Sequence, residues 1–221
     1  MIRVVDIFDE VAEDLRADRA RALFTRYGGV LAGACVLMLL GVAGWQYYQS
    51  RVAAEDRRVA GLFIAATAQS ATLADPAARA AALAAFQKVE AQDHAGYTPL
   101  AQLNEAVLKF DGGDHAGALA QWDRVAANSK LPGAIRDLAS LLWVSHQIDH
   151  GDPSVLAARL QPLLLADNMW HGLASEQMAL ILLRQGQTAQ ARQRLQALQS
   201  DDTAPQGTRS RAAALLSSIG G

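Results

Sequence analysis

The stretch from Tyr27 to Ser50 constrains this chain more than any other part of its sequence. It reads YGGVLAGACVLMLLGVAGWQYYQS and holds about 24 consecutive uncharged residues between two arginines, where a bilayer-spanning helix needs about 20. A tyrosine at one end and Trp45, Tyr47 and Tyr48 at the other are aromatic side chains of the kind that gather at the two membrane–water boundaries. The sequence therefore predicts one transmembrane helix over residues 27–50, with membrane contact from Tyr27 to Tyr48.

A cleaved secretory signal is the competing interpretation of this stretch. Such a signal has a shorter apolar run, a brief basic leader and a small-residue cleavage site, whereas here 26 residues with several acidic groups come first. We therefore expect the segment to be retained. Gly29 and Gly33 form a GxxxG step, which allows close approach of a second helix, from another copy or from a partner.

The first 26 residues predict a short amphipathic helix. Phe8, Val11 and Leu15 recur at helical spacing, and acidic residues fill the first half and arginines the second, which complements the helix dipole. Arginines beside a span favour the cytoplasmic side, and a long C-terminal domain is exported largely regardless of its charge. We thus expect residues 1–26 in the cytoplasm and residues 51–221 on the other side of the membrane.

Residues 51–221 are long enough for one domain with a sizeable core. They are rich in alanine and leucine and poor in β-branched residues, which favours an all-α fold. The formal net charge of the chain is only -2, so no basic surplus indicates a nucleic-acid partner. The single cysteine, Cys35, lies in the predicted membrane helix and cannot form a disulfide within the chain.

Proline, glycine and capping residues divide this domain into helices. A first helix is expected from Val52 to about Leu73, continuous with the membrane helix because no flexible linker separates them. Asp75-Pro76 and Thr98-Pro99 each read as a helix cap followed by proline in the first turn. Further boundaries are expected at Gly112-Gly113, Asp114, Leu131-Pro132, Gly151-Asp152-Pro153, Asn168 and Gly186, with a last helix from about Pro205 to Ile219.

These helices repeat with a regular period. Phe86, Trp122, Leu160 and Leu195 stand 36, 38 and 35 residues apart, and Ala82, Ala118, Leu156 and Ala191 each precede one of them by four. Gly113, Gly151 and Gly186 mark the turn inside three of the units. A period near 34 built as helix, turn, helix is the tetratricopeptide pattern, in which each pair buries its apolar stripe against its neighbours. The second of these three units is the weakest, because Pro162 falls inside its second helix.

The tail VDIFDEVAEDLRADRARALFTRYGG, followed by LGVAGWQYYQ and by degenerate helical pairs, resembles the ancillary Sec translocon subunit family (YfgM-type). These are bacterial single-pass inner-membrane proteins with a periplasmic tetratricopeptide-like domain. The resemblance implies a cytoplasmic N-terminus, a periplasmic helical domain, and association with Sec translocon subunits, periplasmic chaperones and exported client proteins. It also implies no enzymatic activity.

The sequence offers no chemistry that argues for an enzyme. His146 and His150 lie four residues apart, but HQIDH lacks the HExxH arrangement, and we interpret them as histidines at a helix end. No GxSxG elbow, P-loop glycine run or CxxC pair occurs, and Asp201-Asp202 is interpreted as a helix cap. We expect no catalytic residue, metal, cofactor or small-molecule substrate.

The expected function is protein binding. In tetratricopeptide arrays the first helix of each pair lines a groove that holds extended partners. Counting back from the turn glycines places Leu103, Val107, Phe110, Leu141, Ser145, Ile148, Glu176, Leu180 and Leu183 along it. The alternative is that these residues are core between adjacent helices. A chaperone-like accessory of the translocon is the favoured role, and a structural scaffold that tethers envelope or cell-division complexes is the alternative.

Overall fold

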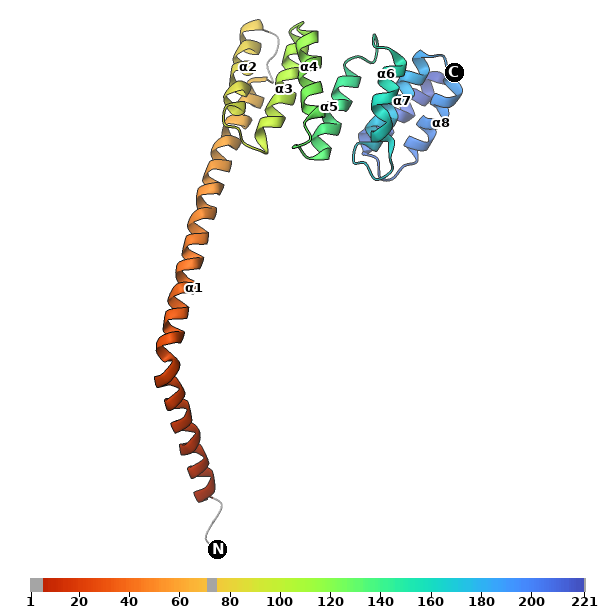
Figure 1. Cartoon of the computed structure of the whole chain (residues 1–221). Coiled ribbons are helices and arrows are strands. Elements are labelled where there is room, and N and C mark those ends of the chain that lie inside the picture. Colours follow the sequence, from red (N-terminus) through yellow and green to blue (C-terminus); the bar gives the residue numbers. More distant parts are fainter. Residues whose placement is uncertain (1–5, 71–74, 221) are drawn as a thin grey trace. The chain divides into compact units, whose positions relative to one another are not determined.

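The computed structural model describes residues 6–70 and 75–220, and it describes side chains from Thr25 onward except those of Gly28 and Leu31. The described elements are all helical (Figure 1). The chain divides into two compact units, one up to Arg58 and one from Val59 onward. The predicted all-α class is therefore confirmed.

Helix α1 (Asp6–Ser70) is continuous through the first unit and supplies the first helix of the second. We expected a separate amphipathic helix over residues 1–26, but no break occurs where it was to end. The sequence explains this, since residues 6–70 contain no proline and an isolated glycine weakens a helix by only about 1 kcal/mol. The amphipathic face predicted for Phe8, Val11 and Leu15 lies outside the described side chains.

Large apolar side chains of the first unit are exposed along α1. They include Val36, Leu37, Met38, Leu39, Leu40, Val42 and Trp45, and Met38 is 72% exposed. Among the residues that the structure describes, no helix combines the length and the apolar character that crossing a membrane requires.

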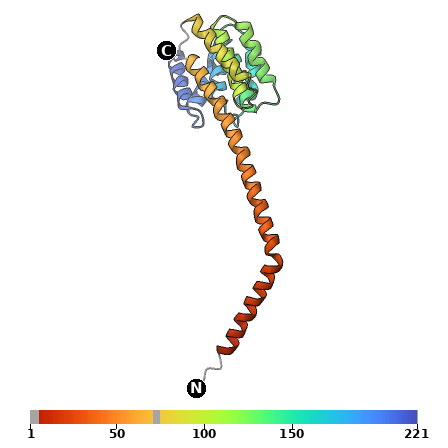
Figure 2. The ribbon, with the colours of Figure 1, turned by 90° about the vertical axis from the view of Figure 1, so that its left-hand side faces the viewer.

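The second unit is a stack of helical pairs that ends in a single helix (Figures 1 and 2). Its elements are the end of α1, α2 (Pro76–Glu90), α3 (Tyr97–Asp111), α4 (His115–Ala127), α5 (Gly133–Ser145), α6 (Pro153–Leu160), the 3-10 helix η1 (Gln161–Leu164), α7 (His171–Arg184), α8 (Thr188–Gln199) and α9 (Gln206–Ile219). The end of α1 pairs with α2, α3 with α4, α5 with α6, and α7 with α8.

The repeat register predicted from the sequence is confirmed by burial. The eight aligned positions, Ala82, Phe86, Ala118, Trp122, Leu156, Leu160, Ala191 and Leu195, are all 0% exposed. Each lies on the second helix of a pair, one turn apart from its companion, where both side chains face the first helix. The same two positions therefore hold every pair together.

Within the described residues the core consists of four clusters, and each joins one pair to the helix that follows it. Phe86 lies in the first cluster, Trp122 in the second, Leu160 in the third and Leu195 in the fourth. Polar contacts follow the same plan. Trp170 donates to the Ala134 carbonyl at 2.9 Å, Arg159 pairs with Asp123 at 2.6 Å, and Arg211 pairs with Glu176 at 2.6 Å, each across 35 or 36 residues.

Three aspartates cap helices as predicted. Asp75, Asp114 and Asp152 accept backbone N–H groups at 2.8 to 3.0 Å at the starts of α2, α4 and α6. Gly113 and Gly186 have φ angles of +91° and +74°, which only glycine adopts without strain.

The predicted cap at Thr98 is wrong. Helix α3 begins one residue earlier, at Tyr97, and Thr98 Oγ1 is buried without a hydrogen-bond partner among the described residues. The ring of His94 does the capping instead, because its Nδ1 accepts the N–H groups of Gly96 and Tyr97 at 3.2 and 3.4 Å.

Two other boundaries differ in detail. Asn168 Oδ1 accepts from the N–H of Trp170 at 2.9 Å, so it orders the turn that precedes α7 and does not cap the helix directly. Asp201 does the same before α9, where its Oδ1 accepts from Thr203 N at 2.9 Å. Pro162, predicted to fall inside the second helix of its unit, lies instead in η1, because α6 ends at Leu160.

Candidate functional site

The nine residues predicted to line a groove do not form one exposed stripe. Three of them are buried, namely Leu103, Leu141 and Glu176. The other six, Val107, Phe110, Ser145, Ile148, Leu180 and Leu183, are partly buried. The α3–α4 and α5–α6 pairs thus place their predicted groove residues largely between adjacent helices, and the groove itself remains a prediction.

Phe110 illustrates this placement. Its ring lies 4.2 Å from the ring of His115 and 4.7 Å from that of His146, measured between centroids, and 6.1 Å from Trp122. Phe110 also packs against the core cluster that contains Trp122. A partner segment cannot reach most of this ring, so Phe110 contributes mainly to the core.

Leu180 and Glu176 are brought together at a shallow hollow between α7 and α9. The hollow measures about 400 Å³ and is also lined by Arg211, Ala214 and Leu215. Arg211 donates to Glu176 from Nε and from one terminal nitrogen, both at 2.6 Å. The hydrogen bonds to Glu176 raise the pKa of Arg211, and this bidentate pair fixes the end of the hollow.

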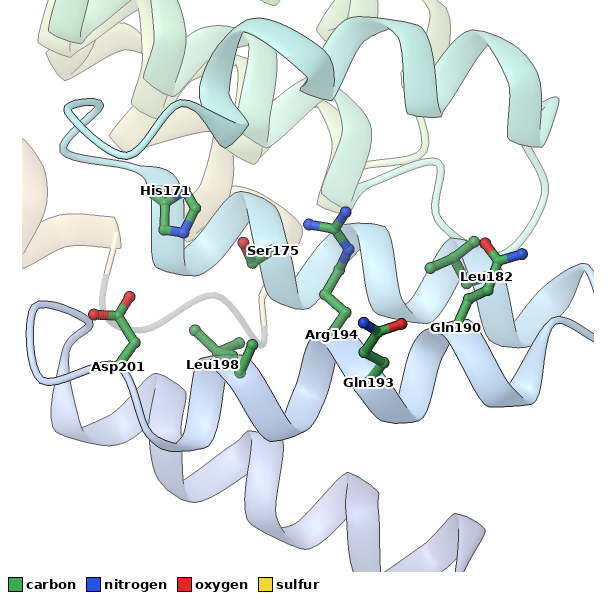
Figure 3. A pocket seen from close by; sticks show the side chains of 9 residues that line it. His171, Ser175, Leu182, Gln190, Gln193, Arg194, Leu198 and Asp201 are labelled. Carbon is green, nitrogen blue, oxygen red and sulfur yellow. The ribbon is translucent and has the colours of Figure 1, made fainter.

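A second, larger pocket of about 590 Å³ lies between α7 and α8 (Figure 3). His171, Ser175 and Leu182 line it from α7. Gln190, Gln193, Arg194, Ala197 and Leu198 line it from α8, and Asp201 closes one end. It occupies a different face of α7 from the first hollow, because neighbours such as Ser175 and Glu176 point about 100° apart around a helix.

Two of the ionisable side chains in this pocket, those of His171 and Asp201, have hydrogen-bond partners, and that of Arg194 has none among the described residues. His171 Nδ1 hydrogen-bonds to the Leu164 carbonyl at 2.8 Å. The pKa of Asp201 is lowered, first by the hydrogen bonds from Thr203 and to a lesser degree by His171. Arg194 has no hydrogen bond or ion pair with any described residue, and burial lowers its pKa.

A third pocket, of about 230 Å³, is lined mainly by polar side chains, several of which bond to one another. Lys109 pairs with Glu105 at 3.0 Å and donates to Gln121 at 2.6 Å, and Gln121 donates to Glu105 at 3.1 Å. Burial raises the pKa of Glu105, but the hydrogen bonds from Lys109 and Gln121 outweigh it and the net pKa is lowered. This network joins α3 to α4 and satisfies the side chains of Glu105, Lys109 and Gln121 with one another.

The two histidines considered as metal ligands are not arranged for one. His146 follows α5 directly, and its Nδ1 hydrogen-bonds to the Leu142 carbonyl at 2.8 Å. Its ring lies 4.4 Å from that of Trp122, measured between centroids, and is tilted against it by 34°, while His150 is exposed. Within the described residues, no group of three or more potential ligands is placed to hold a metal ion.

The stacked pairs of the second unit define a tetratricopeptide-like α-solenoid. A family model described as a tetratricopeptide repeat-like domain matches residues 21–211. The chain therefore belongs to this family, and such domains generally mediate protein–protein interactions. No curated protein and no solved structure gave a significant match.

Sequence reasoning did not identify Arg194 or His171 as site residues. Both lie outside the helix face from which the groove was counted. A usable signal was present in α8, where TAQARQRLQALQ carries two arginines but no acidic residue. Charge balance within a helix therefore indicates candidates that a periodicity count misses.

Proposed function

We propose that this protein is a single-pass protein of the bacterial inner membrane that acts as an accessory of the Sec translocon. Its periplasmic tetratricopeptide-like domain binds other proteins and works with periplasmic chaperones on exported clients. The family match over residues 21–211 carries the proposal of protein binding. The role in export rests on the resemblance of the tail and of the segment that follows it, and no catalytic role is proposed.

The membrane anchor is supported by the exposed apolar side chains of α1. A helix that is apolar around its whole surface is suited to lipid or to a large core, and Leu37, Met38 and Leu40 are each more than 60% exposed. The proposed span covers residues 27–50, and the structure describes all of their side chains except those of Gly28 and Leu31.

Fractionation tests the anchor. Replacing Leu37 and Leu40 together by arginine places two charges near the centre of the span, where each costs about 2.5–3.5 kcal/mol. The variant should leave the membrane fraction, whereas Val52→Arg, beyond the span, should stay in it. Equal retention of both variants after carbonate extraction would contradict the anchor.

Protease protection tests the orientation. Protease added to spheroplasts should digest the domain from Val59 onward. If the domain survives until the membrane is lysed, it lies in the cytoplasm and a periplasmic role is excluded.

Co-purification after mild crosslinking of the full chain separates the two candidate roles. Recovery of Sec translocon subunits and periplasmic chaperones supports the export role. Recovery of cell-wall or division proteins alone supports the scaffold instead, in which the domain tethers complexes without handling unfolded chains.

A further inference from the structure

Arg194 is a cation without an anion. The other arginines of the last helices each have a partner: Arg184 donates to the carbonyls of Ile148 and Gly151, Arg192 to that of Ile219, Arg209 to Asp202 and Arg211 to Glu176. Arg194 has none among the described residues. Placing a guanidinium in a partly buried position without a counter-charge costs free energy, and an anionic ligand would recover it.

The surroundings of Arg194 suit a peptide. In Figure 3 its guanidinium lies in the middle of the pocket, with Gln190 and Leu182 on one side and His171 and Asp201 on the other. The side chains of Gln190 and Gln193 make no hydrogen bond with a described residue, so each can both donate to and accept from a peptide backbone. Leu182 and Leu198 offer apolar contact, and a volume of about 590 Å³ is typical of ligand sites.

The charges in the pocket select among anions. One guanidinium matches one carboxylate in a bidentate pair, whereas a phosphate dianion is better matched by several cations. Asp201 would also repel a second negative charge at its end of the pocket. A single carboxylate is therefore the fitting group.

The position of Arg194 along the pocket selects the kind of carboxylate. The α8 residues that line the pocket run from Gln190 to Leu198, about 12 Å along a helix that rises 1.5 Å per residue. That length accommodates about four extended residues. Because lining residues lie on both sides of Arg194, the bound chain continues in both directions past the carboxylate.

We propose that the pocket between α7 and α8 binds an extended segment of a partner protein, with an internal aspartate or glutamate side chain paired to Arg194. This inference deepens the proposed protein-binding function and rests on it. Burial lowers the pKa of Arg194, which means that the surroundings disfavour its charged form. A bound carboxylate would stabilise that charge.

Calorimetric titration of the full chain in a neutral detergent tests the proposal. The probes are two peptides blocked at both ends, acetyl-Ser-Leu-Glu-Leu-Ser-amide and the same peptide with glutamine at the centre. The glutamate peptide should bind at least about tenfold more tightly, as expected for a charge-assisted pair. Arg194→Gln should abolish the difference, and Arg192→Gln, a neighbour that does not line the pocket, should preserve it.

The two blocked peptides can give three results that would each overturn the proposal. One is equal binding of the two peptides, a second is no binding of either at millimolar concentration, and a third is discrimination that persists in Arg194→Gln. A third probe, the glutamine peptide with a free C-terminal carboxylate, should gain no affinity. If it alone binds, the site takes chain ends and the side-chain assignment is wrong.

Folding and partner capture provide separate readouts. Arg194→Gln should be at least as stable as the natural protein, since it removes an unpaired, partly buried charge; a large loss of helicity would show that Arg194 is structural. If translocon subunits are absent from crosslinked material while peptide discrimination is intact, only the export role fails. If they are recovered equally with Arg194→Gln, which no longer discriminates, the export role stands without this pocket.

Discussion

Replacing Trp122 by alanine should be among the most damaging single changes in the domain. Trp122 is 0% exposed and is the largest fully buried side chain. Its ring lies 4.4 Å from that of His146 and 6.1 Å from that of Phe110, measured between centroids. Truncating a buried Trp costs about 3–5 kcal/mol, and lost ring contacts place this site at the upper end of that range.

The indole nitrogen allows a sharper comparison. Trp122 Nε1 is buried and has no hydrogen-bond partner among the described residues, so Trp122→Phe removes an unsatisfied donor together with part of the ring. The loss of an unsatisfied group offsets part of the cavity cost. We therefore expect Trp122→Phe to cost less than half as much as Trp122→Ala.

Urea denaturation of the full chain in detergent, followed by circular dichroism, measures both variants. Leu165→Ala is the matched control, because Leu165 is 60% exposed and a surface change of this kind alters stability by about 0.5 kcal/mol or less. A loss below about 1 kcal/mol for Trp122→Ala would refute the assignment of this position as the centre of its pair. Equal losses for the alanine and phenylalanine variants would refute the reasoning about the indole nitrogen.

Three further predictions concern other parts of the domain. Phe110→Ser should lower the free energy of unfolding by about 3 kcal/mol or more, while Leu180→Ser, at the rim of the hollow, should lower it by clearly less; equal losses in urea melts would contradict this difference. The lowered pKa of Glu105 means that its contribution to stability is fully present above a pH of about 4.5 and is lost as pH falls through the folded-state pKa. Glu105→Gln should flatten the acid limb of a plot of stability against pH, and an unchanged slope would show that the network does not hold the carboxylate ionised. Gly113→Ala forces a Cβ into a φ of +91° and should cost about 1 kcal/mol or more, whereas Gly61→Ala, on an open helical face, should be neutral or stabilising by thermal melting.

The fold was predictable because its signals repeat. Each of the four units carries the same two buried positions, and aspartate followed by proline or glycine followed by aspartate punctuates the helices at three starts. A helix start that was predicted from a single local pattern was less reliable. Thr98-Pro99 has the composition of a helix start, but α3 already begins at Tyr97, where His94 Nδ1 accepts the N–H groups of Gly96 and Tyr97.

The candidate sites were harder to predict for a physical reason. Counting along the first helix of a pair gives the angle of a side chain but not what covers it. The neighbouring pair decides that, and it covers Leu103 and Leu141 while leaving Leu180 at a hollow. Arg194 was missed because an unpaired charge is defined by its distance from other charges, which only the folded chain fixes.

The contacts that recur every 35 or 36 residues have a consequence for assembly. Each pair offers its successor the same surface that it receives from its predecessor, so the stacking is head-to-tail and has no geometric reason to stop. Growth of this kind leads to fibres when an apolar end face is left open. The exposed positions of α9 outside the hollow between α7 and α9 include Gln206, Ser210 and Ser217, and none of the large apolar side chains of α9 is exposed. A polar end face of this kind lacks the apolar surface that end-to-end stacking of further copies would bury.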